Sequence, residues 1–248
     1  MTTDRYGARR SNAPPNDEFT DFLSLLNELK STGCTLLVVG DARRKLFTRA
    51  SASLLGNGNT LRYRLLAVTD ASSGSVERRL PDPDESPFSL ARTTKIANYE
   101  VTPRAVAEAV PRDEEFEEIP ETHVPDARID GLRSELVSGI EEFARHTDGF
   151  RPAELRVGVD SLGTLLDHHG EDAVRDYCRT VGRRVREHNG MAHYVLRDAH
   201  GSERVQSLAA EVDAVIEIRP VNSETDDHDA EQRWHVPDRG TTTNWVRL

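Results

Sequence analysis

The sequence predicts an α/β protein with a mostly parallel sheet, helices on both faces and a C-terminal antiparallel hairpin. Short apolar runs rich in β-branched residues alternate with longer stretches of helical periodicity. Gly or Asp follows several of these runs, as is common at strand ends. Strands that alternate with helices build parallel sheets covered on both faces. No helical pattern separates the last two runs, which predicts two adjacent hairpin strands.

The first part of the chain predicts a helix, a strand, a second helix and a second strand. Residues 1–17 are polar and contain prolines, so we expect a disordered N-terminal lead. Apolar residues at helical spacing predict a helix over 19–29, and a buried strand follows over 34–39. A helix over 46–55 and a strand over 61–69 come next, with Asp70 at the carboxyl end of that strand.

The rest of the chain predicts a weakly ordered excursion and then further alternation of strands and helices. Seven prolines and an acidic run interrupt residues 71–127, where we expect only a short strand over 95–101 and a short helix over 103–109. The later strands are predicted over 153–160, 191–196, 212–219, 232–236 and 242–246. The later helices are predicted over 129–149, 162–166, 171–189 and 205–211. Residues 18–248 are expected to form one domain.

The amino-acid composition indicates a high-salt environment and makes one class of partner unlikely. The net charge is −11, and the chain has 3 Lys against 29 Arg. Abundant carboxylates with almost no Lys are typical of halophilic archaea, where molar salt screens repulsion between surface carboxylates. A GC-rich genome also favours Arg over Lys and is the alternative. The negative charge makes nucleic acid an unlikely partner. A cytoplasmic protein is expected, because no run approaches the ~20 apolar residues of a membrane helix and no apolar signal core is present.

A strand, a turn and a helix stand where a phosphate-binding loop would lie. The working motif is G-x-x-x-x-G-K-[ST], in which backbone amides and Lys hold phosphates and the hydroxyl holds magnesium. Gly40 matches the first glycine, but Lys45, Leu46 and Phe47 occupy the glycine, lysine and hydroxyl positions. Lys45 and Thr48 are each displaced by one position, which turns them by ~100° on a helix. Alternatively, this segment is only a strand followed by a tight turn.

A second feature points to the same kind of site. The strand predicted over 153–160 ends in Asp160-Ser161, and a helix follows it. In phosphate-loop ATPases, an acid at such a strand end holds magnesium. An acid at a strand end is a common feature, so it indicates a nucleotide site only together with the strand, turn and helix around Gly40.

The order of these segments resembles the RecA/KaiC superfamily. The matching segments are 34–55, 155–166, 173–196 and 212–219, and the run Val159-Asp160-Ser161-Leu162 is similar to the magnesium-site strand of that superfamily. More closely, residues 18–248 resemble an uncharacterised haloarchaeal family of KaiC-like proteins with a degenerate phosphate loop.

The resemblance implies a RecA-like sheet and a vestigial nucleotide site. Its residues would be Gly40, Lys45, Thr48, Asp160 and Ser161. Relatives carry a catalytic acid at the tip of the second strand, and only Asp70 corresponds by position. Because the lysine, the magnesium hydroxyl and a clear activating glutamate are missing, we expect no catalytic residue and no cofactor. ATP with magnesium would be a cofactor only in the alternative given next.

The sequence therefore predicts a non-catalytic regulatory or scaffolding protein that acts through protein–protein contacts. The resemblance implies a homo-oligomer or a complex with an active RecA/KaiC-like paralogue. One alternative is an ATPase that uses Lys45 and Thr48 in a rearranged loop. Another is a DNA-associated recombinase paralogue, which the acidic balance disfavours.

Other polar clusters predict no further site. His168-His169 and His228 lie near acids, but adjacent helical residues diverge too far to share one ion, so we expect no metal. An arginine stretch over 175–186 is expected to be a solvated helix face paired with nearby acids, with docking of an acidic partner as the alternative. Cys34 and Cys178 are expected to be buried, inert thiols.

Overall fold

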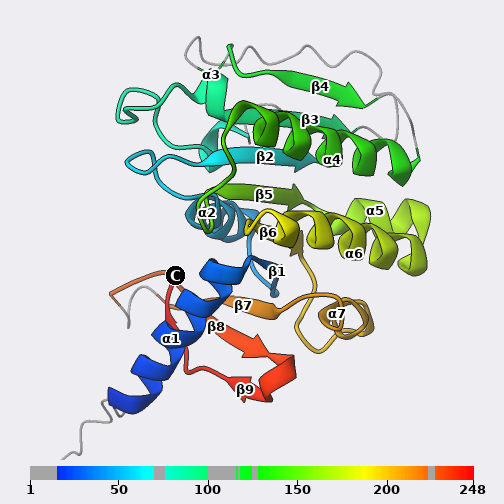
Figure 1. The fold of residues 1–248 in the computed structure, drawn as a ribbon. Helices are drawn as coiled ribbons and strands as arrows, with labels where there is room; N and C mark the ends of the chain where they lie inside the picture. The colour runs from blue at the N-terminus through cyan, green and yellow to red at the C-terminus, as the bar shows by residue number, and fades with distance from the viewer. Residues whose placement is uncertain (1–15, 70–75, 100–115, 117, 125–127, 223–226) are drawn as a thin grey trace, which may run out of the picture.

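A ten-stranded sheet organises the part of the chain that the computed structural model describes, namely residues 16–69, 76–99, 116, 118–124, 128–222 and 227–248. The strand order is β10-β8-β7-β1-β6-β5-β2-β3-β4, with β9 paired to β8 (Figure 1). The strands are β1 (Cys34–Val39), β2 (Tyr63–Val68), β3 (Thr94–Tyr99), β4 (Glu121–Val124), β5 (Leu155–Asp160), β6 (Met191–Leu196), β7 (Ala214–Pro220), β8 (Ala230–Val236), β9 (Thr241–Thr242) and β10 (Val246–Arg247).

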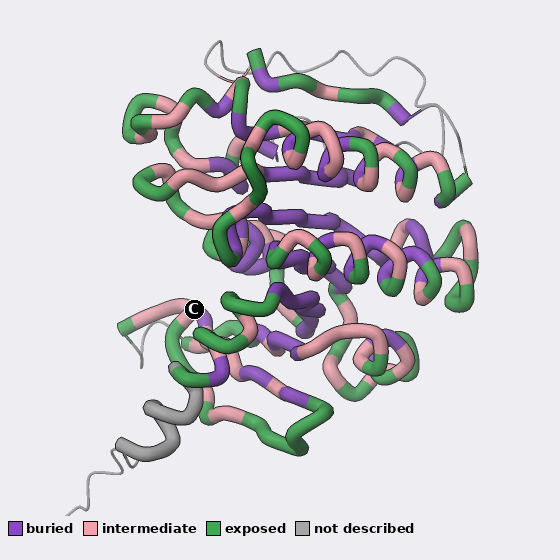
Figure 2. Tube along the Cα trace, viewed as in Figure 1, coloured by how far each residue is buried: buried purple, intermediate pink, exposed green. Residues whose placement is uncertain are grey.

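Helices cover both faces of this sheet. The helices are α1 (Asn16–Thr32), α2 (Arg44–Leu55), α3 (Leu90–Thr93), α4 (Ile129–His146), α5 (Leu162–His169), α6 (Glu171–Glu187) and α7 (Glu203–Ala209), with 3₁₀ turns η2 (Glu77–Arg79) and η4 (Pro237–Arg239). Apolar residues of α4, α5, α6 and α7 share one core with the sheet. Residues of α1 and α2 pack with β1, β7 and β8 in a second core on the other face. Figure 2 shows the central strands buried between these layers.

The predicted fold class is confirmed. Every pairing among β1 to β7 is parallel, and β8 runs antiparallel to β7, β9 and β10. The central strands are buried along their whole length, because helices cover both faces.

The end of the chain differs from the prediction in one respect. The strand predicted over 242–246 is instead two short strands, β9 and β10, with residues 243–245 between them. The Thr243 hydroxyl accepts a hydrogen bond from the backbone N–H of Trp234, while the ring of Trp245 lies against the guanidinium groups of Arg219 and Arg233. The Thr243 hydroxyl thus replaces a backbone carbonyl as the acceptor for Trp234, and regular pairing with β8 resumes only at Val246.

The excursion at 71–127 holds more structure than its sequence indicated. The strand predicted over 95–101 is present as β3, whereas the helix predicted over 103–109 lies outside the described residues. The 3₁₀ turn η2, helix α3 and strand β4 were not predicted. They matter for the site, because η2 packs against α2.

Two further predictions concern burial and the membrane. Cys34 and Cys178 are both buried, as expected, and burial raises the pKa of the Cys34 thiol to about 12. Burial also raises the pKa of Cys178, so both thiols stay protonated at neutral pH. Among the described residues, none of the helices has the length and apolar character needed to span a bilayer.

Candidate functional site

The residues expected to form a nucleotide site lie at the carboxyl ends of β1 and β5. Both strands are parallel to β6, which lies between them, so their ends are about 10 Å apart at the usual strand spacing. Gly40 follows β1, Lys45 and Thr48 lie in the first turns of α2, Asp160 is the last residue of β5, and Ser161 follows it. The two groups therefore face the same edge of the sheet, as the resemblance implies.

The turn after β1 is closed around Gly40. Its backbone N–H donates to the carbonyl of Asp198 at 2.8 Å, which joins this turn to the loop after β6. A Cβ at Gly40 would lie 2.2 Å from the carbonyl oxygen of Ile218, and its φ is +146°. Glycine is therefore required here by close packing against β7.

The residues that follow Gly40 enter α2 at once. The helix begins at Arg44, so only three residues separate it from Gly40. Leu46 and Phe47, at the lysine and hydroxyl positions of the motif, are buried in the core under the helix. In place of a phosphate-binding lysine and a magnesium hydroxyl, the loop thus supplies two apolar core side chains.

The displaced candidates Lys45 and Thr48 are directed elsewhere. Lys45 is exposed on α2. The Thr48 hydroxyl donates to the carbonyl of Arg44, one turn earlier in the same helix, at 3.2 Å. This contact is an ordinary bond of a helical threonine to its own backbone.

At the end of β5, the carboxylate of Asp160 is ion-paired with Arg79 of η2. The side chains of both residues are almost completely buried. Val157 and Val159 join the core on the α4–α6 face, so Asp160 points to the α2 face, where η2 packs. The Arg79 guanidinium therefore supplies the positive charge beside the acid that would hold magnesium.

Neighbouring groups fix Ser161 and the end of β2. The Thr69 hydroxyl donates to the carbonyl of Ser161 at 2.7 Å and accepts from its N–H at 2.8 Å. The backbone N–H of Thr69 also donates to the carbonyl of Asp160 at 2.9 Å, and the Asp160–Ser161 peptide bond is cis. Ser161 occupies the N-cap position of α5, although its side chain makes no capping hydrogen bond. Asp70 lies outside the described residues.

A row of buried polar side chains beneath α2 was not predicted. The side chains of His193 and Ser51 meet with Nε2 and Oγ 2.8 Å apart. Burial, followed by the charges of Arg156 and Arg79, lowers the pKa of His193 to about 3, so this imidazole is neutral at pH 7. The sequence offered no signal for this contact, because His193 lies in an apolar strand and Ser51 in an ordinary helix.

Two buried arginines hold the C-terminal end of α2. Arg64 donates to the carbonyls of Leu55, Gly56 and Asn57, and Arg156 donates to the carbonyl of Leu54. The last carbonyls of a helix have no partner within the helix and carry a partial negative charge, which suits a cation. These arginines therefore anchor α2 rather than bind a ligand.

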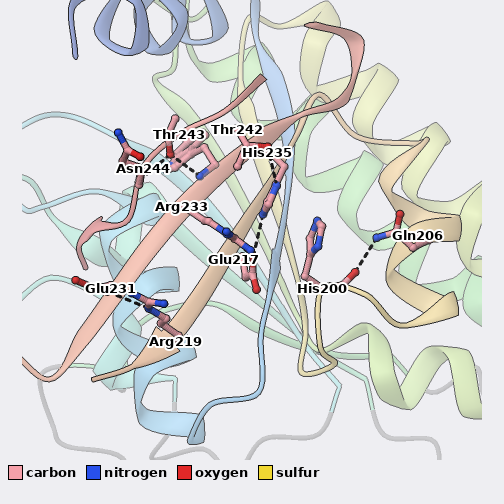
Figure 3. A network of polar contacts seen from close by, with 11 residues as sticks. His200, Gln206, Glu217, Arg219, Glu231, Arg233, His235, Thr242, Thr243 and Asn244 are labelled. Carbon is pink, nitrogen blue, oxygen red and sulfur yellow. Dashed lines mark hydrogen bonds and ion pairs between the residues drawn. The ribbon is translucent and has the colours of Figure 1, made fainter. Parts of the chain in front are cut away.

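A second polar cluster lies on β7, β8 and the loop after β6, close to the turn at Gly40, because Glu217 is the register partner of Val39. Figure 3 shows His200 from the loop after β6, Glu217 on β7 and His235 on β8. Their potential metal-binding atoms all lie within 4.8 Å of one another. This cluster could not be predicted from the sequence, because its members lie 17 and 18 residues apart and meet only when β7 and β8 pair.

Hydrogen bonds define the geometry of this cluster. Glu217 Oε2 lies 2.9 Å from His235 Nε2 and accepts a 2.7 Å hydrogen bond from Arg233 Nε. Burial acts to raise the pKa of Glu217, but these two contacts outweigh it and hold the pKa below its usual range. Burial and the nearby His235 lower the pKa of His200.

The histidines singled out from the sequence make other contacts. His169 Nε2 lies 2.8 Å from the Tyr99 hydroxyl, and His168 is exposed. His228 contacts Asp227 and Glu231. Neither His168-His169 nor His228 belongs to a three-residue metal-binding group within the described residues.

The arginine stretch on α6 is paired with acids, as expected, although two of these acids, Glu141 and Glu211, lie outside α6. Arg175 and Arg179 both donate to Glu211, and Arg184 pairs with Glu141 as well as Glu187. These pairs tie α6 to α4 and to the residues after α7. Most of the basic side chains are therefore engaged within the molecule.

Comparison with known proteins gives a family without an assigned role. Residues 33–218 match the model of a family described as "Family of unknown function (DUF7504)". The matched span starts just before β1 and ends within β7. A search of curated proteins finds no match.

Proposed function

This chain belongs to the DUF7504 family, whose function is unknown, and we propose that it is a non-catalytic RecA/KaiC-like regulatory or scaffolding protein. In this proposal it acts in the cytoplasm of a halophilic archaeon through protein–protein contacts. It keeps the sheet of a nucleotide-binding ancestor without turning over ATP.

The buried ion pair between Arg79 and Asp160 is the observation that carries this proposal. A magnesium ion held by Asp160 would have to displace a guanidinium that is itself almost fully buried. Removing one partner of a buried ion pair costs about 3–5 kcal/mol, because the other charge remains without compensation. Asp160 therefore suits a structural ion pair better than a metal that must come and go with nucleotide.

The β1–α2 connection supports the same conclusion independently. A phosphate loop presents successive backbone amides and a lysine to the nucleotide. Here Gly40 is packed against β7, α2 begins at Arg44, and Leu46 and Phe47 are core residues. The described residues thus do not fit ATP with magnesium in the way that the resemblance would imply.

The arrangement of the sheet supports a RecA-like ancestry. The four segments that carry the resemblance contain β1, β5, β6 and β7. These strands are parallel neighbours in the order β7-β1-β6-β5, so the segments form one continuous core. Adjacent loops after β1 and β6 lead to helices on opposite faces, which is where open α/β sheets bind ligands.

The proposed partners are further copies of this chain or an active RecA/KaiC-like paralogue. Sedimentation equilibrium in molar KCl tests the first of these directly. We expect a mass that is a multiple of 27.7 kDa and that does not change when ATP and magnesium are added. A strictly monomeric chain would leave the paralogue as partner. Assembly that requires ATP would contradict a non-catalytic scaffold and favour the ATPase alternative.

A further inference from the structure

We propose that His200, Glu217 and His235 form a binding site for a divalent transition metal of the zinc type. This site lies on β7, β8 and the loop after β6, and it is independent of the proposed scaffolding role. Two imidazole nitrogens and one carboxylate oxygen form a ligand set used by catalytic zinc sites, which leave a fourth position for water. Magnesium and calcium prefer all-oxygen ligand sets, so the two histidines favour a transition metal.

The distances are close to those that a metal requires. The ligand atoms lie within 4.8 Å of one another. Ligands bound to zinc at ~2.0–2.1 Å in a tetrahedral arrangement are ~3.3 Å apart. The His235–Glu217 contact at 2.9 Å is about 0.4 Å shorter than this separation, so these two atoms need to move apart only slightly. A metal would therefore enter by replacing one hydrogen bond and drawing His200 inward.

Metal binding requires one rearrangement, and it involves His200, which is the only one of the three residues that lies in a loop. The His200 and His235 rings are stacked, with centroids 3.9 Å apart and planes inclined by 17° (Figure 3). A metal lies in the plane of each imidazole that binds it, so one ring must turn out of the stack. His200 is in a loop, whereas His235 and Glu217 are on paired strands, so we expect the His200 ring to rotate about its side-chain torsions.

Neighbouring residues can hold the ligands in place. Nδ1 of His235 lies 3.1 Å from the Thr242 hydroxyl, which would orient this ring and leave Nε2 for the metal. Arg233 and His235 both contact Oε2 of Glu217, so Oε1 can turn to the ion while Arg233 keeps its bond. Such outer contacts commonly raise metal affinity by ~10–100-fold.

The test is zinc binding by the full chain in molar KCl, after treatment with a chelator. Titration of Zn²⁺ against a chromophoric zinc indicator gives the affinity, and Co²⁺ absorption reports the nitrogen and oxygen ligands. We expect one equivalent of metal, with binding weakened at least ~10-fold in His200→Asn, Glu217→Gln and His235→Asn. The matched control is His228→Asn, a histidine in contact with two other carboxylates, and it should bind zinc like the unmodified protein.

Two outcomes would overturn the proposal. One is the lack of stoichiometric Zn²⁺ binding by the unmodified protein. The other is binding that His200→Asn and His235→Asn leave unchanged. Because His200 lies in a loop, its variant should melt at the same temperature as the unmodified protein without metal, which separates loss of the site from loss of the fold.

Discussion

The guanidinium of Arg79 forms a buried ion pair with the carboxylate of Asp160, at the strand end where a magnesium-binding acid was predicted. The pair links the 3₁₀ turn η2 to the centre of the sheet. That Arg79 is the partner of Asp160 was not evident from the sequence, because Arg79 lies in a proline-rich stretch that was expected to be weakly ordered.

Arg79→Met should destabilise the protein by about 3–5 kcal/mol, because it leaves the Asp160 carboxylate buried without its cation. The double variant Arg79→Met/Asp160→Leu should recover much of this loss, since apolar replacements of a buried pair are often neutral. Urea unfolding in molar KCl measures both changes. Arg78→Met is the matched control, because Arg78 is exposed on the same turn. A loss in the double variant as large as in Arg79→Met would show that the pair does not act as a unit.

Gly40→Ala should destabilise the protein by at least ~2 kcal/mol, because the new Cβ would lie 2.2 Å from the carbonyl oxygen of Ile218 at an unfavourable φ. Gly201→Ala is the control, since a Cβ there has no atom within 4 Å, and it should change stability by less than ~0.5 kcal/mol. Thermal unfolding measures both variants. Equal melting temperatures would mean that the turn at Gly40 is not closed by packing.

His193 should make the protein less stable as the pH falls. Its pKa of about 3 in the folded state lies below the ordinary value near 6.5, so the unfolded chain takes up a proton that the folded chain does not. Its contribution is fully present above pH ~6.5 and is lost progressively toward pH ~3. Between pH ~6.5 and ~5, where most carboxylates remain ionised, the loss from this group should be about 1–2 kcal/mol.

Urea unfolding at those two pH values measures this contribution by comparison with His193→Gln. The variant should be less stable at both, but its free energy of unfolding should fall by less as the pH decreases. If both proteins lose the same stability, the imidazole of His193 is not held neutral by the fold.

The excess of carboxylates should make the fold depend on salt. With a net charge of −11, removal of salt lengthens the range of repulsion between surface carboxylates and should lower the melting temperature. Dialysis from molar to millimolar KCl followed by thermal unfolding provides the measurement. A melting temperature that does not change with salt would contradict a halophilic origin and favour a GC-rich genome.

The central elements could be predicted because their patterns are local. The run over residues 34–39 became β1 and that over 191–196 became β6 with the predicted limits, since a strand buried on both faces is an unbroken apolar run. The break between the two short final strands could not be predicted, because it depends on side-chain contacts of Thr243 with Trp234 and of Trp245 with Arg219 that no local pattern encodes.

Only part of the candidate site could be predicted from the sequence. The absence of the phosphate-loop residues could be read directly at Leu46 and Phe47. The ion pair of Asp160 with Arg79 could not be predicted, because an arginine in a segment without clear periodicity gives no sign of its distant partner. For the same reason the meeting of His200, Glu217 and His235 depends on strand pairing that no local motif encodes.

Binding of a fluorescent ATP analogue with magnesium in molar KCl tests whether the protein has lost its nucleotide site. Unmodified protein, Lys45→Ala and the exposed control Lys30→Ala should all show no saturable binding at micromolar concentrations, because Asp160 is paired with Arg79 and the loop positions are core residues. Micromolar binding that Lys45→Ala abolishes and Lys30→Ala preserves would contradict a lost site and establish a rearranged nucleotide site.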